Sequence, residues 1–404
     1  MNPDSHIPII NLPGSKSISN RLLLIKAIGD LSFKIENISD SDDTTILQKY
    51  LLEIKSGKSE IDIHHAGTNM RFLCSYLATL ENKSFTLTGS ERMKQRPIKD
   101  LVDALKQIEA DINYIEKEGY PPLKINGKKL IENEITINAN VSSQFTTSLL
   151  LIAPTFENGL KIKLSGQLVS PSYIKLTIEL MRSFEIDVEW KGDEIIITKG
   201  KYKTDNLSFY NESDWSAASY FYSAMALGKI DQLELHGLNK NSLQPDSIVA
   251  KTYEQFGITT EYHENKITLH KTKCNITNFK FDFTDCPDIA QTLAITCLGL
   301  RINAELTGLQ TLKIKETDRI LALKTELEKF GAVVEANNNS LKLNFGSVKN
   351  ENKEITIQTY NDHRMAMSFA PLQFLFPKIK IENKNVVSKS FLNFWNEASK
   401  LNLG

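Results

Sequence analysis

The stretch LVDALKQIEADINYI at residues 101–115 is typical of an amphipathic helix that stops at a small break and continues as a β-strand. The same order recurs in LTIELMRSFEIDVEW (176–190), KTYEQFGITTEY (251–262) and LKTELEKFGAVVE (323–335). One bulky apolar anchor precedes each break, and the anchors, Ile108, Phe184, Phe256 and Phe330, are separated by 76, 72 and 74 residues. Such a constant period indicates a repeated supersecondary unit.

Helices and strands alternate in these units, so the sequence predicts an α/β fold. Five or six units of this length fit into 404 residues, and a chain of that size exceeds what one hydrophobic core usually supports. We therefore expect two domains, although no linker rich in Pro, Gly or Ser separates them. From composition alone, the best boundary lies near the polar stretch NESD at 211–214. Ligands bind preferentially at interfaces between domains.

Composition excludes several classes of protein. The chain is 41% apolar and 24% charged with a formal charge of −1, so nothing indicates a nucleic-acid partner or a membrane partner. The start MNPDSHIPII has neither a basic segment nor an apolar segment of signal-peptide length, and we expect a cytoplasmic protein. The four cysteines form no CxxC pair and have no metal-ligand spacing with His, which predicts reduced thiols and no metal site.

Arginine is rare in this chain, with eight Arg among 48 basic residues. The planar guanidinium grips carboxylate and phosphate at two points, which Lys cannot do, so the Arg positions are candidates for anion sites. We interpret Arg182 and Arg301 as solvated surface charges. The other six lie in the motifs described below: Arg21, Arg71, Arg92, Arg96, Arg319 and Arg364.

Two motifs have the pattern of a helix N-terminus that binds an anion. In LPGSKSISNR (12–21), Ser15 or Ser17 can cap a helix whose free N–H groups, together with Lys16 and Arg21, favour phosphate or carboxylate. HAGTNMR (65–71) repeats this pattern, with Thr68 as the expected cap. The full P-loop spacing is absent, so a capped helix with a solvated Lys is an equally open interpretation of the first motif.

Three further segments supply cations or neutral donors. ERMKQRPI (91–98) places three basic residues within five positions, and a solvated loop is the alternative interpretation. VSSQFTTSLL (141–150) and VSPSY (169–173) carry hydroxyl and amide groups at expected starts of helices, where plain capping is the alternative.

The acidic candidates are Asp288 in DCPDIAQT and Glu316 in KIKETDR. If the second segment is helical, Glu316 and Arg319 lie one turn apart, and a surface ion pair is the alternative interpretation. TYNDHRMAM (359–367) follows later in the chain, and Lys389 lies in VVSKSF.

Taken in order along one chain, GSKSxSNR, AGTxMR, RMKxRPI, SSQF, SxxY, PDxA, KETDR and DHRMAM resemble the 5-enolpyruvylshikimate-3-phosphate synthase family from about residue 12 to residue 391. The resemblance implies a two-domain inside-out α/β barrel built from six repeated βαβαββ units. It also implies that the chain crosses twice between the domains. The first lobe would span residues 14–212, and the second would combine residues 1–13 with 213–404.

The resemblance further implies two small-molecule substrates, shikimate 3-phosphate and phosphoenolpyruvate, and no cofactor, metal, nucleic acid or membrane. We expect a monomer. The residues implied for shikimate 3-phosphate are Ser17, Arg21, Ser142, Ser143, Gln144, Ser170, Tyr173, Asp288 and Lys315. Those implied for phosphoenolpyruvate are Lys16, Gly67, Arg96, Gln144, Arg319, Arg364 and Lys389.

The reaction requires a hydroxyl group to lose a proton and a methylene carbon to gain and return one. We assign Asp288 as the base for the hydroxyl group, and Glu316 with Lys16 as the proton exchangers at the methylene carbon. Lys389 and the Arg groups would stabilise charge on the departing phosphate. Because cations from both halves must meet the same anions, we expect an open and a closed form.

Four positions depart from the family pattern: His65, Asn69, Thr311 and Leu392. They affect the expected shape of the phosphoenolpyruvate pocket. Two other functions remain open: a sister transferase that acts on a UDP-sugar, and a non-catalytic binding protein. The first often carries a reactive Cys before its Arg-Pro, whereas residues 91–95 here contain none. The second would not need the acidic residues.

Overall fold

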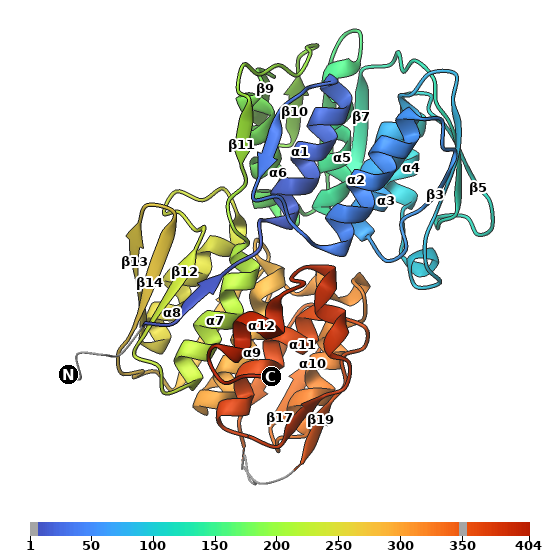
Figure 1. Ribbon diagram of the computed structural model, residues 1–404. Helices are drawn as coiled ribbons and strands as arrows, with labels where there is room; N and C mark the ends of the chain where they lie inside the picture. Colours follow the sequence, from blue (N-terminus) through green and yellow to red (C-terminus); the bar gives the residue numbers. More distant parts are fainter. Residues whose placement is uncertain (1–6, 347–353) are drawn as a thin grey trace. The chain divides into compact units, whose positions relative to one another are not determined.

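The computed structural model describes residues 7–346 and 354–404, and it shows a mixed α/β fold in two compact units (Figure 1). The first unit is Lys16–Asn211. The second unit joins the chain before Lys16 to Glu212–Gly404. The chain therefore passes between the units twice. Residues 1–6, which the resemblance assigns to the second lobe, lie outside the described residues.

Three sheets and six α-helices make up the first unit. In spatial order, the sheets are β3 (Glu60–Asp62), β4 (Ser84–Thr88), β6 (Leu123–Asn126) and β5 (Asp111–Tyr114); β7 (Glu134–Asn138), β8 (Leu160–Ser165), β10 (Glu194–Ile197) and β9 (Val188–Lys191); and β11 (Ser208–Tyr210) with β2 (Lys34–Glu36). The helices are α1 (Lys16–Gly29), α2 (Asp42–Lys55), α3 (Gly67–Ala78), α4 (Lys99–Gln107), α5 (Ser143–Ile152) and α6 (Pro171–Ser183).

The described residues of the second unit have a matching set. The sheets are β1 (Ile9–Asn11), β12 (Gln232–His236), β14 (Lys266–Lys271) and β13 (Ile258–His263); β15 (Asn278–Asp282), β16 (Asn303–Thr307), β18 (Leu341–Asn344) and β17 (Val333–Ala336); and β19 (Ile355–Ile357) with β20 (Ile379–Ile381). The helices are α7 (Trp215–Leu227), α8 (Val249–Tyr253), α9 (Ala290–Leu300), α10 (Arg319–Glu328), α11 (His363–Phe369) and α12 (Phe394–Ser399).

All four of the four-stranded sheets share one topology. Their first two strands are parallel, as in β3 with β4 and β7 with β8, and an antiparallel hairpin completes each sheet. The four sequence anchors occupy equivalent places, and each is at most 2% exposed. Each lies at the end of the helix that precedes, along the chain, β5, β9, β13 or β17. The hydrophobic period therefore records where each helix turns back into its sheet. Within the described residues, no sheet closes into a barrel.

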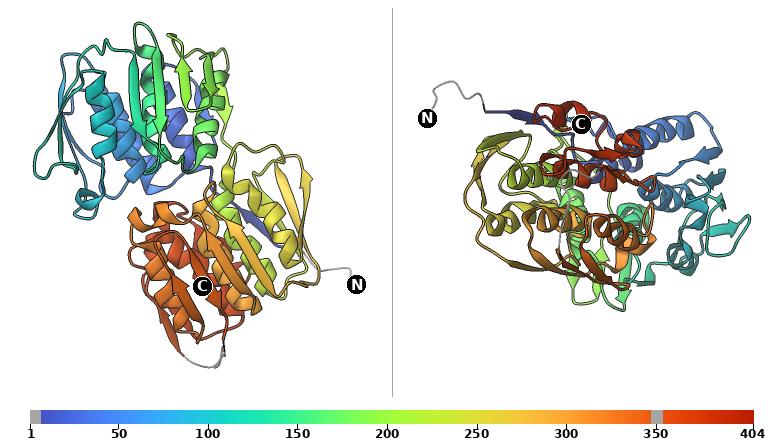
Figure 2. Two further views of the ribbon diagram at one scale, coloured as in Figure 1. Left: turned by 180° about the vertical axis from the view of Figure 1, so that it is seen from behind. Right: turned by 90° about the horizontal axis from the view of Figure 1, so that it is seen from below.

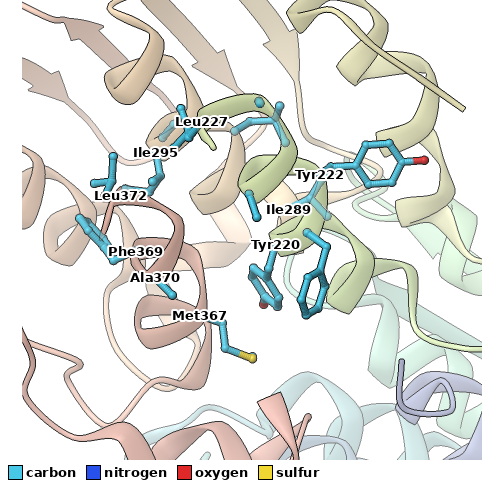
Figure 3. Close-up of a cluster of buried hydrophobic side chains, with 14 of the residues drawn as sticks. Tyr220, Tyr222, Leu227, Ile289, Ile295, Met367, Phe369, Ala370 and Leu372 are labelled. Carbon is cyan, nitrogen blue, oxygen red and sulfur yellow. The ribbon is translucent and has the colours of Figure 1, made fainter. Parts of the chain in front are cut away.

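Helices fill the interior of each unit. Every residue of α7 and α11 is buried, and most of α3, α5 and α9 is buried as well. A helix that is apolar on all sides is stable only when it is surrounded. Figure 3 shows side chains of α7, α9 and α11 gathered in the core of the second unit, and Figure 2 lets the helices and sheets be followed from behind and from below. No helix in the described part of the chain combines the length and apolarity needed to cross a bilayer.

Hydroxyl groups link the buried helices at matching positions. Ser75 of α3 donates to Ser148 of α5 over 2.9 Å. In the second unit, Thr292 of α9 lies 3.1 Å from the hydroxyl of Ser219 and 3.2 Å from that of Ser368. Small side chains allow the helices to approach closely, and the mutual hydrogen bonds satisfy the buried oxygens. These contacts help to hold the helices of each unit together.

The anchor Phe184 provides a test of this packing. Its ring lies 5.2 Å from Phe33 and 5.8 Å from Phe209, so it joins the end of α6 to the sheet formed by β2 and β11. We expect Phe184→Ala to lower the free energy of unfolding by about 3–5 kcal/mol, because it removes buried area and leaves a cavity. Urea denaturation followed by circular dichroism measures the effect. Leu207→Ala, at a side chain that is 86% exposed, is the control, and an equal loss in both variants would contradict the prediction.

Candidate functional site

The sequence motifs lie at the N-terminal ends of helices. In the first unit, Lys16 begins α1, Gly67 begins α3, and Ser142 and Ser170 occupy the N-cap positions of α5 and α6. In the second unit, Asp214, Asp318 and Asp362 cap α7, α10 and α11, and Asp288 lies in the 3-10 helix Pro287–Ile289 that runs into α9. Free N–H groups and the helix dipole make such ends favourable for anions.

Arg319 lies at the centre of the candidate site in the second unit. Its side chain is 2% exposed, and its Nε donates to Asp362 Oδ2 over 2.6 Å. Nη1 donates to Asp288 Oδ1 over 3.0 Å, and Nη2 donates to Glu316 Oε2 over 2.8 Å. Burial alone would lower the pKa of Arg319, but the charges of the three carboxylates raise it. The cation is therefore fixed in charge and in direction.

Arg364 is held beside Arg319 from the start of α11. Its Nη2 lies 3.0 Å from Asp288 Oδ2, so Asp288 bridges the two guanidinium groups. Nη1 donates to the Tyr220 hydroxyl and to the Asp288 carbonyl, both over 3.3 Å. Burial would lower the pKa of Arg364, whereas Asp288 and other anionic neighbours raise it. Burial also raises the pKa of Tyr220 to about 12, which keeps its hydroxyl group protonated.

Two lysines complete this cluster. Lys389 Nζ donates to Glu316 Oε1 over 2.6 Å, and Lys315 Nζ lies 3.7 Å from Asp288 Oδ1. Glu316 therefore connects Lys389 with Arg319. The structure thus brings together all six site residues that the sequence predicted in this unit: Asp288, Lys315, Glu316, Arg319, Arg364 and Lys389. Lys315 and Glu316 precede α10 instead of lying on it, so the expected helical spacing is wrong although the ion pair forms.

Arg21 occupies a different kind of environment in the first unit. It is 3% exposed, and its guanidinium donates to the Thr177 hydroxyl over 2.8 Å, to the Ser17 carbonyl over 2.8 Å and to the Tyr173 carbonyl over 3.4 Å. Burial lowers the pKa of Arg21 to about 10, so the group stays charged at neutral pH. Among the described contacts of Arg21, all acceptors are neutral. An anion could therefore gain the full attraction of this cation.

Arg96 packs directly on Gly67 at the start of α3. The Arg96 side chain is buried, and a Cβ atom added to Gly67 would lie 2.8 Å from its Cζ atom. Of the three basic residues in the 91–98 segment, Arg92 is exposed, and Lys94 pairs with Glu116 over 3.1 Å. Of the three, only Arg96 is buried, and its place in an anion site stays a prediction. The others match the solvated loop.

Neutral donors surround the N-terminal ends of α3, α5 and α6. Ser142 caps α5 by accepting from the Gln144 N–H, and Gln144 Nε2 donates to the Thr68 hydroxyl over 3.1 Å. Thr68 lies inside the first turn, whereas the N-cap is Ala66, so the expected capping role of Thr68 is wrong. Ser170 has a φ of 52°, a left-handed conformation that costs free energy and frequently marks functional positions. Ser143 is buried in the first turn of α5.

The ionic partner of Lys16 lies outside all of the sequence motifs. Lys16 Nζ lies 3.3 Å from Asp43 Oδ2, and Asp43 is 2% exposed. Asn69, one of the departures from the family pattern, helps to fix Asp43, because its side-chain amide donates to the Asp43 carbonyl over 2.6 Å and accepts from Asn20. Asp43 lies in the acidic run DSDD at 40–43, which resembles an ordinary helix start. Only its burial marks it as part of the site.

The other departures lie in different surroundings. His65 Nε2 is 3.7 Å from Asp42 Oδ2. Thr311 is buried, and no hydrogen-bond partner reaches its hydroxyl oxygen within the described residues. Leu392 is 54% exposed. In the part of the chain that the structure describes, no group of His, Cys, Asp and Glu residues has the arrangement of a metal site.

The sequence of the chain is similar to that of known proteins. The family model for EPSP synthase (3-phosphoshikimate 1-carboxyvinyltransferase) matches residues 48–398. The chain belongs to the EPSP synthase family. A 3-phosphoshikimate 1-carboxyvinyltransferase of Bacteroides fragilis (strain YCH46) is 45% identical over 396 residues, which cover 98% of this chain and 95% of the relative. One from Colwellia psychrerythraea is 36% identical over 416 residues, covering 97% and 96%.

Solved structures show the same fold as this EPSP synthase family member. An EPSP synthase from Acinetobacter baumannii has a TM-score of 0.74 at 20% identity and covers 98% of this chain and 97% of its own. The enolpyruvyl transferase NikO from Streptomyces tendae has a TM-score of 0.70 at 12% identity, with 98% and 95% covered.

The contact between Gly67 and Arg96 generates a prediction for this family member. We expect Gly67→Ala to displace the Arg96 guanidinium and to raise the dissociation constant for phosphoenolpyruvate, the anion that the motifs imply, about tenfold. Calorimetric titration measures the affinity. The melting temperature should change little, because the displaced atoms are the far end of a flexible side chain. Gly200→Ala, whose Cβ would meet only the tip of Ile186, is the control. An unchanged affinity of Gly67→Ala for phosphoenolpyruvate would show that Arg96 does not contribute to binding this anion.

Proposed function

We infer that this chain transfers the enolpyruvyl group of phosphoenolpyruvate to the 5-hydroxyl of shikimate 3-phosphate, a step of the shikimate pathway towards aromatic amino acids. The products are 5-enolpyruvylshikimate 3-phosphate and phosphate. The observation that carries this inference is the 45% identity, over nearly the full length of both chains, to a 3-phosphoshikimate 1-carboxyvinyltransferase. The cations and carboxylates clustered at helix N-termini are the chemistry that such a reaction needs.

We propose that shikimate 3-phosphate is bound mainly by the first unit. Arg21 supports this role, because it is a buried cation whose acceptors in the described structure are hydroxyl and carbonyl oxygens. The start of α5 adds neutral donors that suit phosphate and hydroxyl oxygens. The proposed contacts are Ser17, Arg21, Ser142, Ser143, Gln144, Ser170 and Tyr173, with Asp288 and Lys315 contributed by the second unit.

We propose that phosphoenolpyruvate is bound by the remaining cations. Its phosphate and carboxylate groups suit guanidinium forks, and both Arg319 and Arg364 have their direction fixed by carboxylates. The proposed contacts are Lys16, Gly67, Arg96, Gln144, Arg319, Arg364 and Lys389.

The proposed chemistry proceeds through a tetrahedral intermediate. Asp288 removes the proton of the 5-hydroxyl as that oxygen attacks C2 of the enol, and Glu316 with Lys16 delivers a proton to the methylene carbon. In the second step the C–O bond to phosphate breaks and the methyl carbon returns a proton, which restores the double bond. Lys389 and the arginines stabilise the departing phosphate. The hydrogen bond from Lys389 to Glu316 supports the proton-exchange role of Glu316, because the charge of the neighbouring lysine affects how readily that carboxylate takes up and releases a proton.

We also propose the finer architecture that the family resemblance implies. The two units would be the two lobes, assigned to residues 14–212 and to residues 1–13 with 213–404, and the six sheets would be six copies of one βαβαββ unit. The shared order of the four-stranded sheets supports this view, with the two-stranded pairs as shortened copies. We further propose an inside-out barrel in each lobe, and a monomer in the cytoplasm, which sedimentation velocity and cell fractionation can test.

A substrate comparison tests the proposed reaction. Phosphate release from phosphoenolpyruvate should require shikimate 3-phosphate and should not occur with a UDP-N-acetyl sugar. Product identification by mass spectrometry accompanies the assay. Turnover with the UDP-sugar but not with shikimate 3-phosphate would overturn the assignment. If no phosphate is released with either acceptor, a binding protein would be favoured.

The role of Glu316 gives a second test. We expect Glu316→Gln to lower kcat at least a hundredfold while the dissociation constant for shikimate 3-phosphate changes less than threefold, because the amide keeps the shape but cannot carry the proton. Steady-state kinetics and equilibrium titration measure the two effects. The matched control is Glu328→Gln on α10, where the carboxylate is exposed and pairs with Lys324. Unchanged kcat in Glu316→Gln would remove Glu316 from the mechanism.

A further inference from the structure

Asp246 is a buried carboxylate that the proposed reaction does not use. It lies in the short 3-10 helix Pro245–Ile248 and is 2% exposed. Its Oδ2 atom accepts a hydrogen bond from the Ser216 hydroxyl. Its Oδ1 atom is buried and has no hydrogen-bond partner within the described residues. An unsatisfied buried carboxylate is costly and calls for a functional explanation.

The segment before Asp246 is fixed against the start of α7. Gln244 accepts from the Trp215 N–H over 3.2 Å, and its amide donates to Glu212 Oε2 over 2.7 Å and to the Ser213 carbonyl over 2.8 Å. These bonds hold Gln244 against the residues that directly precede Ser216. The position of Asp246 beneath the first turn of α7 is therefore determined by its surroundings.

Ser216 connects Asp246 to Arg364. The Ser216 hydroxyl oxygen lies 3.5 Å from Arg364 Nη2, the same nitrogen that contacts Asp288. Arg364 is thus placed between two carboxylates, Asp288 in direct contact and Asp246 through one hydroxyl. Both carboxylates lie in short 3-10 helices, of which the one with Asp246 runs into α8 and the one with Asp288 runs into α9.

The charged and titratable groups that face Asp246 come from four segments. They are Asp288 before α9, Arg364 on α11, Asp214 at the cap of α7, and the Cys286 thiol. Burial, and after it the charge of Asp288, raise the pKa of Asp246 to about 7 against the opposing effects of Arg364 and Ser216. The carboxyl group is therefore neutral below about pH 7 and charged above it.

We propose that Asp246 is a positioning residue which, through Ser216, orients Arg364 and sets how strongly this guanidinium attracts phosphoenolpyruvate. The proposal rests on the phosphoenolpyruvate-binding role proposed above for Arg364. When Asp246 is ionised, its negative charge partly offsets the positive charge of Arg364 and repels an anionic substrate. The net attraction of Arg364 for an anion is then weaker. When Asp246 is protonated, the attraction is stronger.

Asp246→Asn removes the charge and keeps an oxygen that can accept from Ser216. At pH 8, where wild-type Asp246 is ionised, we expect the KM for phosphoenolpyruvate of this variant to be about three- to tenfold lower than that of the wild type. At pH 6, where both are neutral, the two values should agree within about twofold. Comparing variant with wild type at each pH cancels the ionisation of the substrate. A ratio that is the same at both pH values would overturn the proposal.

Ser216→Ala separates orientation from charge. This variant keeps the carboxylate but removes the bridge, so we expect a higher KM for phosphoenolpyruvate at both pH values. An unchanged KM would refute the orienting part of the proposal. Thermal melting of each variant checks folding, since a merely structural role for Asp246 would lower stability without a pH-dependent KM.

Arg364→Lys distinguishes this inference from the proposed role on which it depends. If Arg364→Lys leaves the KM for phosphoenolpyruvate unchanged, the role of Arg364 fails. If the KM rises but the Asp246→Asn ratio is independent of pH, only the present inference fails. Should Asp246→Asn not fold, sulfate serves as a probe in the wild type, because its charge is constant between pH 6 and 8. Its competitive inhibition against phosphoenolpyruvate should weaken as the pH rises, and inhibition that stays constant would overturn the proposal.

Discussion

Arg319 could not be buried without the carboxylates that surround it. Moving a lone guanidinium out of water costs several kcal/mol, and a buried cation is tolerated only when its donors are matched by acceptors of opposite charge. Asp288, Glu316 and Asp362 meet that requirement from three different segments of the chain. The ends of α9, α10 and α11 are therefore held together by one side chain. The other cations of the candidate site in this unit, Lys315, Arg364 and Lys389, contact Asp288 or Glu316.

The repeated fold explains why these segments can meet. In each four-stranded sheet the first two strands are parallel, and each of them leads into a helix. The helices that follow these two strands therefore begin at the same edge of the sheet. Buried helices with small hydroxyl side chains bring these ends close together. Their dipoles add partial positive charge where anions are to bind. Helix N-termini gathered in this way are favourable for anions whichever side chains surround them.

The two units use this surface differently. In the first unit, Arg21 is held by hydroxyl and carbonyl oxygens, and burial lowers its pKa. In the second unit, Arg319 and Arg364 are paired with carboxylates, which raise their pKa. The first arrangement favours strong attraction of a phosphate. The second gives weaker net attraction but places proton acceptors beside the cations, which suits a reaction that moves protons.

The sequence by itself determined the repeat, because the anchors Phe184, Phe256 and Phe330 follow from local periodicity and helix termination. It also indicated the motifs, since Gly, Ser and Arg at helix starts have local chemical reasons. Tertiary structure alone decided which charges pair. Asp43 and Asp246 look like ordinary surface acids in the sequence, yet each is 2% exposed. Asp43 contacts Lys16, and Asp246 is linked to Arg364 through the Ser216 hydroxyl. Pairing depends on burial and on contacts between distant segments, and neither leaves a local pattern in the chain.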